Sequence, residues 1–349
     1  MANIDNQARP MAPGAEPGRD GVRVSPFIGG YAARLMGIPL QDYYSDPALA
    51  VRAQMLTRAL HGHDDPPSFG WADWGAWEFG GRIRFPHSDG EAAPSTAESP
   101  VKKPSDVDRL PVPDPKTAGW FPLIREYNRL MVGLGFPPRV KGGAVTNVVA
   151  AMLGRENLLR WYLREPEAVK VAYEKASDLI ISAADTVIAE FGPEFRFGYG
   201  APLDANDLVS PRIFEKFSWP YLKKVHQAML DRGASSFNVH ICGDHRKNLA
   251  AWAALPWPPG SVVSIGADMD LVETAEAFSH KHIIAGNVST TILAEGGYDD
   301  VTAAARRCVE IGRTLPGGFM LTPACEMPVL TPPLNVHALL TGWKESERH

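Results

Sequence analysis

The feature that most limits the possible folds is an alternation of strand-like and helix-like segments through the second half of the chain. Short runs with strand character occur at 139–142, 195–199, 237–241, 262–266, 282–285 and 318–322. Helix-like segments lie between and after them, at 146–163, 166–191, 211–232, 246–255, 272–280, 299–314 and from 334 onward. Strands that alternate with helices form a parallel sheet covered by helices. Because no Gly-x-Gly-x-x-Gly or Walker sequence follows these strands, we expect an α/β fold of the (β/α)8 barrel type, not an open nucleotide-binding sheet.

The N-terminal third of the chain predicts an extension to this barrel. Residues 1–22 are rich in Pro, Gly, Ala and charged side chains, so we expect a flexible arm there. The pattern from 25 to 61 is helical, residues 66–118 are polar and proline-rich, and a further helix is expected at about 119–133. We therefore expect a single barrel domain over 23–345, with an N-terminal helical and irregular extension.

Charge and cysteine content exclude several classes of protein. The 35 Lys and Arg against 40 Asp and Glu give a net charge of −5, which argues against a nucleic-acid partner. Three cysteines in 349 residues argue against a disulfide framework and favour a reducing compartment, so we expect a cytoplasmic protein. The beginning of the chain has no apolar signal-peptide core, and no run of 18 apolar residues predicts a membrane span.

The strongest chemical signal lies at the ends of two predicted strands. His240 and Cys242 are two residues apart, so on an extended segment their side chains point to the same side. Cys325 follows the last predicted strand, and strand ends meet at one rim of a barrel, so a separation of 83 residues in sequence is no obstacle. One imidazole and two thiolates with an open position are typical of catalytic zinc. The alternative is two buried cysteines and a histidine that serve packing alone.

Three carboxylates are candidates for a fourth ligand or for an outer hydrogen-bonding group: Asp204, Asp244 and Glu326. Glu326 adjoins Cys325, and Asp204 directly follows a predicted strand, so Asp204 and Glu326 are the candidate catalytic residues. For each one, a solvated loop carboxylate is the alternative. Cys308 lies within a predicted helix, and we expect it to serve packing.

Other groups of residues favour structural roles. The segment 61–65 has a metal-like composition, with two histidines and two aspartates, but it follows a helix, where such residues often cap. Trp71, Trp74 and Trp77 are spaced by three, which is typical of an apolar face, with a wall for a flat ligand as the alternative. Asn287 follows a strand and is either a turn residue or a rim amide.

The sequence His240-Ile-Cys-Gly, followed by Cys325, resembles the zinc motif of the methylcobalamin:coenzyme M methyltransferases, which lie within the uroporphyrinogen decarboxylase superfamily. The likeness covers most of residues 25–345 and includes the stretches 37–47, 208–224, 286–288 and 331–336. The resemblance implies a (β/α)8 barrel whose mouth holds zinc and receives a corrinoid protein. It also implies a monomer or a homodimer, as is common for barrels of this superfamily.

The chain departs from both branches of that superfamily. The arginine signature of the decarboxylases, which holds substrate carboxylates, is absent from residues 25–34, and their late histidine is replaced by Cys325. The Gly-Pro-Phe-Thr loop of the coenzyme M enzymes is here Gly142 to Thr146, which leaves the identity of the acceptor open.

The chain also lacks Asp-x-His-x-x-Gly, the usual corrinoid-binding signature, so cobalamin is expected from a partner protein or from solution. The resulting hypothesis is a zinc-dependent methyltransferase that moves a methyl group between cobalamin and a small-molecule donor or acceptor. A tetrapyrrole decarboxylase is the alternative, and a non-catalytic zinc or corrinoid carrier is a third.

Overall fold

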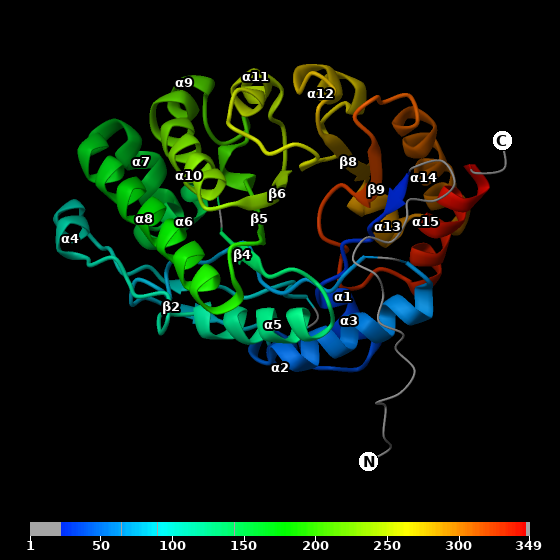
Figure 1. Ribbon diagram of the computed structural model, residues 1–349, viewed down its shortest axis with the longest axis horizontal. Helices are drawn as coiled ribbons and strands as arrows, with labels where there is room; N and C mark the ends of the chain where they lie inside the picture. Colours follow the sequence, from blue (N-terminus) through cyan, green and yellow to red (C-terminus); the bar gives the residue numbers. More distant parts are fainter. Residues whose placement is uncertain (1–21, 64, 89, 143, 347–349) are drawn as a thin grey trace, which may run out of the picture.

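The centre of the protein is a sheet of parallel strands surrounded by helices, as Figure 1 shows for the computed structural model, which describes residues 22–63, 65–88, 90–142 and 144–346. Within the described residues the sheet has seven strands in the order β1-β9-β8-β7-β6-β5-β4, and every neighbouring pair is parallel. The strands are β1 (Arg23–Val24), β4 (Arg139–Lys141), β5 (Phe195–Gly200), β6 (Ala234–Ile241), β7 (Val262–Ile265), β8 (Ile283–Val288) and β9 (Phe319–Pro323). The expected α/β class is confirmed.

The segment from Asp65 to Ser68 connects the two edges of this sheet. The Ser25 hydroxyl, which follows β1, donates to Asp65 Oδ2 at 2.6 Å. On the other edge, Lys141 at the end of β4 donates from Nζ to Ser68 Oγ at 2.7 Å. Side-chain hydrogen bonds therefore connect β1 to β4 through a segment that forms no strand ladder, in keeping with the expected barrel.

The helices that cover the sheet follow its strands in turn. They are α6 (Val145–Leu153), α7 (Arg155–Arg164), α8 (Pro166–Phe191), α9 (Pro211–Ile213), α10 (Trp219–Asp231), α11 (Leu249–Ala253), α12 (Leu271–Ala277), α13 (Thr290–Glu295), α14 (Tyr298–Gly312) and α15 (Pro333–Ser346). The longest, α8, begins with Pro166 at its first position, where a missing N–H costs nothing. Its buried residues recur every three or four positions, so one stripe packs on the sheet.

Several elements differ from the sequence prediction. The expected helix at 146–163 is two helices, α6 and α7, because Gly154 between them has φ 85° and ψ 134°, which is not helical. The expected helix at 211–232 contains a π-helical turn, Phe214–Ser218, between α9 and α10. The strand β1 and the helix α13 were not expected from the sequence.

The N-terminal extension consists of helices and one hairpin that precede β4 in the chain. It contains α1 (Gly30–Leu35), α2 (Leu40–Ser45), α3 (Pro47–His61), the antiparallel hairpin of β2 (Arg82–Arg84) and β3 (Ser95–Glu98), α4 (Pro104–Arg109) and α5 (Phe121–Gly133). Trp71 and Trp74 are buried here, and Trp74 stacks on Trp120 with ring centroids 5.2 Å apart, so these tryptophans belong to the core. The flexible arm expected at 1–22 lies outside the described residues, except for Val22, which is buried.

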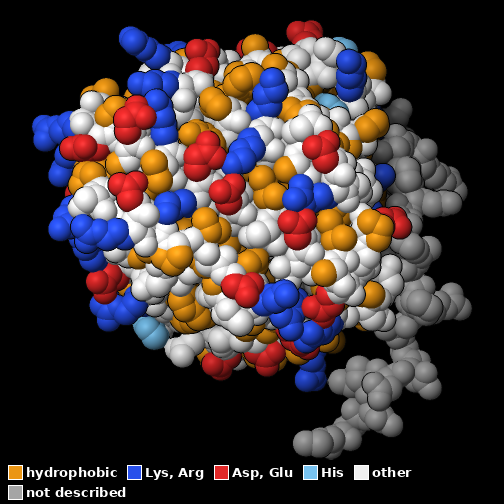
Figure 2. Space-filling model, turned by 60° about the vertical axis from the view of Figure 1, so that its left-hand side comes forward, with side chains coloured by type: hydrophobic (Ala, Val, Ile, Leu, Met, Phe, Trp, Pro, Cys, Tyr) orange, Lys and Arg blue, Asp and Glu red, His pale blue; other side chains and the backbone are white. Residues whose placement is uncertain are grey.

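The surface carries charges of both signs. Figure 2 shows one face, where basic side chains are interspersed with acidic ones and hydrophobic side chains are scattered between them. Among the described helices, none combines the length and the apolar character that crossing a membrane requires.

Candidate metal centre

Two of the candidate ligands lie at the C-terminal end of β6. His240 is the last residue but one of this strand, and Cys242 follows its end. Val239 and Ile241, the residues that alternate with them, are fully buried on the other face of the sheet. The period of two in a strand therefore directs His240 and Cys242 to the same side, as the sequence predicted.

Cys325 joins them from the loop that follows β9. The Sγ atoms of Cys242 and Cys325 are 3.8 Å apart. One ligand atom from each of His240, Cys242 and Cys325 lies within 4.8 Å of the other two. No other group of three such side chains meets this criterion among the described residues. The structure thus brings together the three residues that the sequence singled out.

The spacing of the sulfur atoms fits a shared metal ion and does not fit a disulfide. All three cysteines are free thiols, and a disulfide would place the sulfurs only about 2 Å apart. Two sulfurs bound to one tetrahedral zinc, each at about 2.3 Å, would lie about 3.8 Å apart. The observed 3.8 Å agrees with that value. Thiolates and imidazole are ligands that favour zinc over magnesium or calcium.

The imidazole of His240 is held in one orientation by its neighbours. Its Nδ1 lies 3.0 Å from the hydroxyl oxygen of Ser264, which is its cross-strand partner on β7. Its Nε2 is buried and has no hydrogen-bond partner within the described structure. A histidine that ligates a metal through one nitrogen usually hydrogen-bonds through the other. Nε2 is therefore the ring nitrogen available to a metal.

The two thiols influence each other. Their contact lowers the pKa of Cys242 and raises the pKa of Cys325, and burial raises the pKa of both groups. The opposite directions fit a Cys325 thiol that donates to Cys242, because such a hydrogen bond favours the thiolate of Cys242 and the protonated form of Cys325. A bound dication would favour the deprotonated form of both thiols, because a metal ligand must be a thiolate.

The two candidate catalytic carboxylates lie in different surroundings. Asp204 is fully buried and accepts a hydrogen bond from Thr146 Oγ1 on α6 at 2.7 Å. Thr146 is also within hydrogen-bond distance of Ser218 and Tyr173, so Asp204 belongs to a hydroxyl network that joins α6, α8 and the π-helical turn before α10. Burial raises its pKa to about 6. Asp204 is not part of the group of close ligand atoms.

Glu326 follows the third ligand and faces the loop after β1. Its Oε1 accepts a hydrogen bond from the backbone N–H of Gly30 at 3.3 Å. Burial raises its pKa to about 7, and the positive charge of Lys141 partly opposes this shift. Asp244, the third carboxylate considered, instead forms an ion pair with Arg246 at 2.6 Å, and its pKa is lowered to about 2.

The remaining sequence candidates have structural contacts. Cys308 lies in α14, packs against the core, and its Sγ is 3.9 Å from Asn287 Oδ1. Asn287 donates to the carbonyls of Gly266 and Met269, so it fastens the loop after β7. His61 Nε2 is 2.9 Å from the Tyr31 hydroxyl, and burial lowers its pKa to about 4.

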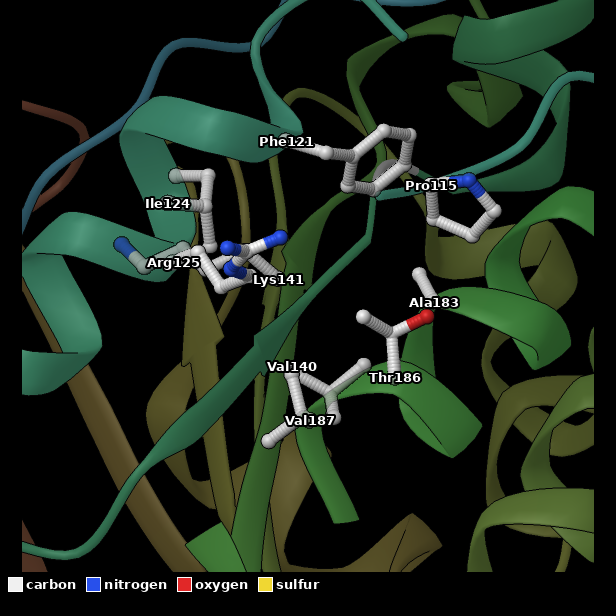
Figure 3. A pocket seen from close by; sticks show the side chains of 9 residues that line it. All are labelled: Pro115, Phe121, Ile124, Arg125, Val140, Lys141, Ala183, Thr186 and Val187. Carbon is white, nitrogen blue, oxygen red and sulfur yellow. The ribbon is translucent and has the colours of Figure 1, made fainter. Parts of the chain in front are cut away.

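A pocket lies on the outside of the barrel, between α5, β4 and α8. Figure 3 shows that mostly apolar side chains line it, including Phe121, Ile124, Val140 and Val187. None of the three candidate metal ligands is part of its lining.

Ser264 and Phe27 both contact His240 but were not identified from the sequence. The ring of Phe27 packs edge-on against His240, with centroids 6.2 Å apart. The only sequence signal for Ser264 is its polar side chain in an otherwise apolar strand, and its register with His240 cannot be read without the fold. Phe27 gives no such signal, because its position depends on an unusual backbone angle.

Comparison with known proteins agrees with this architecture. A solved methyltransferase from Methanosarcina mazei superposes with a TM-score of 0.76 at 21% sequence identity, over 93% of this chain and 94% of that one. A B12-independent methionine synthase from Shewanella sp. W3-18-1 has a TM-score of 0.56 at 11% identity, over 94% and 96%. At these identities the likeness concerns the fold.

Two curated relatives share parts of the sequence. The chain is 27% identical to the methylcobamide:CoM methyltransferase MtbA of Methanosarcina mazei over 171 residues, which are 49% of this chain and 44% of that protein. It is 22% identical to a methylated-thiol–coenzyme M methyltransferase of the same organism over 252 residues, 67% of this chain and 63% of that one. The chain thus spans less than two thirds of the length of either relative.

The family model described as uroporphyrinogen decarboxylase (URO-D) matches residues 23–345, almost the whole described chain. This range includes every strand of the sheet and all three candidate ligands. The chain therefore belongs to the uroporphyrinogen decarboxylase family.

Proposed function

We propose that this protein is a zinc-dependent methyltransferase that moves a methyl group between a corrinoid cofactor and a small-molecule substrate. The observation that carries the proposal is the convergence of His240, Cys242 and Cys325, whose ligand atoms lie within 4.8 Å of one another. The relatives named as methylcobamide and methylated-thiol methyltransferases support the reaction class.

In this proposal the three side chains leave one position of a tetrahedral site open for the substrate. Zinc bound there would lower the pKa of a substrate thiol or hydroxyl and so supply a nucleophile at neutral pH. Ser264 fixes the ring of His240 through Nδ1. Glu326 fastens the Cys325 loop to the backbone of Gly30, and Asp204 holds the turn after β5 through Thr146. We propose outer, positioning roles for these two carboxylates.

The corrinoid is proposed to come from a partner protein or from solution, because the chain has no Asp-x-His-x-x-Gly sequence of its own. The proposed location is the cytoplasm, since Cys242, Cys308 and Cys325 are all free thiols. The monomer or homodimer expected from the sequence stays a prediction.

A tetrapyrrole decarboxylase is the second candidate, and the name of the matching family model favours it. The sequence argues against it, because residues 25–34 lack the arginine signature that would bind substrate carboxylates. The two thiols and the imidazole also form a ligand set that suits a soft metal. None of these three side chains is a lysine or arginine that could bind a substrate carboxylate.

The experiment is a spectral assay of methylcobalamin with a panel of thiol and hydroxyl acceptors, in parallel with an assay of uroporphyrinogen turnover. We expect demethylation with at least one acceptor, loss of this activity after treatment with a zinc chelator, and its return on adding zinc. Turnover of uroporphyrinogen by metal-free protein, without methyl transfer, would establish the second candidate in place of the first.

A further inference from the structure

The loop that follows β1 contains a strained residue. Phe27 has φ 47°, in the left-handed region that bulky side chains rarely adopt. Only two other non-glycine residues of the described chain share this conformation, Ser279 and His280, and both lie after α12. Strain of this kind persists only where the surroundings enforce it, and it concentrates at functional sites.

Backbone contacts with the loop after β9 enforce this conformation. The carbonyl of Phe27 accepts a hydrogen bond from the Met327 N–H at 3.0 Å. Three residues later, Gly30 donates to the Glu326 carboxylate. Between them lies Gly29, where a Cβ would collide with the Glu326 carboxylate and force that side chain to move. The loop from Phe27 to Gly30 is thus fastened to the segment that begins with the ligand Cys325.

The ring of Phe27 extends from this loop to the other half of the site. It packs edge-on against the His240 imidazole, with an interplanar angle of 75°. It is half-buried and does not belong to the hydrophobic core of the described protein. Core packing therefore does not account for the strain.

We propose that Phe27 is a positioning residue of the metal centre. Its ring and the Ser264 hydroxyl together fix the His240 imidazole, while its backbone is tied to the Cys325 loop. Phe27 thereby links His240 on β6 to Cys325 after β9, and holds both side chains in position before metal binds. This inference rests on the proposed function, because it requires a metal at the centre.

The test compares Phe27→Leu, Phe27→Gly and Phe27→Tyr with Ser279→Gly as a matched control. Phe27→Gly removes the ring and relieves the backbone, whereas Ser279→Gly relieves a similar backbone angle, φ 52°, at a residue without a ligand contact. The measurements are zinc affinity by competition with a chelator and the absorption spectrum of the cobalt(II)-substituted protein, which reports ligand geometry.

We expect Phe27→Leu and Phe27→Gly to bind zinc roughly 10- to 100-fold more weakly, the range known for residues that orient ligands, and to alter the cobalt spectrum. Phe27→Tyr keeps the ring and should restore both properties, and Ser279→Gly should change neither. Wild-type zinc affinity and an unchanged cobalt spectrum in Phe27→Leu and Phe27→Gly would overturn the inference and leave the metal site intact. Wild-type protein that binds no metal would overturn both the inference and the proposed function.

Discussion

Burial determines the pKa of the Asp204 carboxylate. Asp204 is only 1% exposed, and its Oδ2 has no hydrogen-bond partner in the described structure. A charged carboxylate in such a place is costly, which is why its pKa is raised to about 6. The hydroxyl of Thr146 offsets only part of this cost.

The sign of this shift gives a test by pH. The pKa of Asp204 rises from 3.8 in the unfolded chain to about 6 in the folded one, so the folded protein binds the extra proton and loses stability as pH rises through this window. Asp204→Asn stays neutral and keeps an oxygen to accept from Thr146. Relative to wild type, we expect this variant to gain about 2 kcal/mol in unfolding free energy between pH 4 and pH 7, as measured by urea denaturation. An equal difference at both pH values would contradict this account.

At the scale of elements, the sequence predicts those helices and strands that are long enough to show a repeating pattern of apolar residues. The strands β5 to β9 and the helix α8 are visible in the sequence because each has a long or largely apolar pattern. The strand β1 has two residues and α13 has six, too few for a period to appear. The three candidate ligands could be grouped from the sequence because His240 lies at the end of a strand and Cys242 and Cys325 lie just after strands. The contacts of Phe27 and Ser264 depend on tertiary register, which local patterns do not contain.

The division between α6 and α7 gives a prediction at this scale. Gly154 has φ 85° but ordinary space around it, with Ser99 Oγ 3.6 Å from the place of a Cβ. Gly154→Ala should therefore cost about 1–3 kcal/mol through backbone strain alone. Gly133→Ala, at the last residue of α5 with nothing near the place of a Cβ, is the control and should be neutral or stabilising. Denaturation midpoints measure both, and a Gly154→Ala variant as stable as wild type would show that the backbone angle does not divide the two helices.

At the scale of the whole molecule, curvature of the sheet brings the three candidate ligands together. The strands β6 and β9 are separated by β7 and β8 in the sheet. In a flat sheet this order would put them about 14 Å apart, at roughly 4.8 Å per strand. The ligand atoms are nevertheless within 4.8 Å of one another. A barrel rim brings the strand ends together, and the hydrophobic core that builds the barrel contains none of the three ligands.

Because the core does not depend on the metal, removal of zinc should leave the fold intact. We expect chelator-treated protein to keep its circular dichroism spectrum and a cooperative thermal transition, with a lower Tm only by the amount that ligand binding contributes. A structural zinc site would behave differently, since its loss unfolds the domain. Unfolding on chelation would show that the site is structural.

The central claim is that one metal ion is shared by ligands from two distant parts of the chain, and the zinc content of the purified protein tests it most directly. We expect about one zinc per chain in the wild type and in Cys308→Ala. The Cys308 side chain packs against the hydrophobic core and is not one of the three candidate ligands. Cys325→Ala should be folded, nearly free of zinc and without methyl transfer, and His240→Ala and Cys242→Ala should behave in the same way. Full zinc occupancy with near-normal methyl transfer in Cys325→Ala would contradict the account.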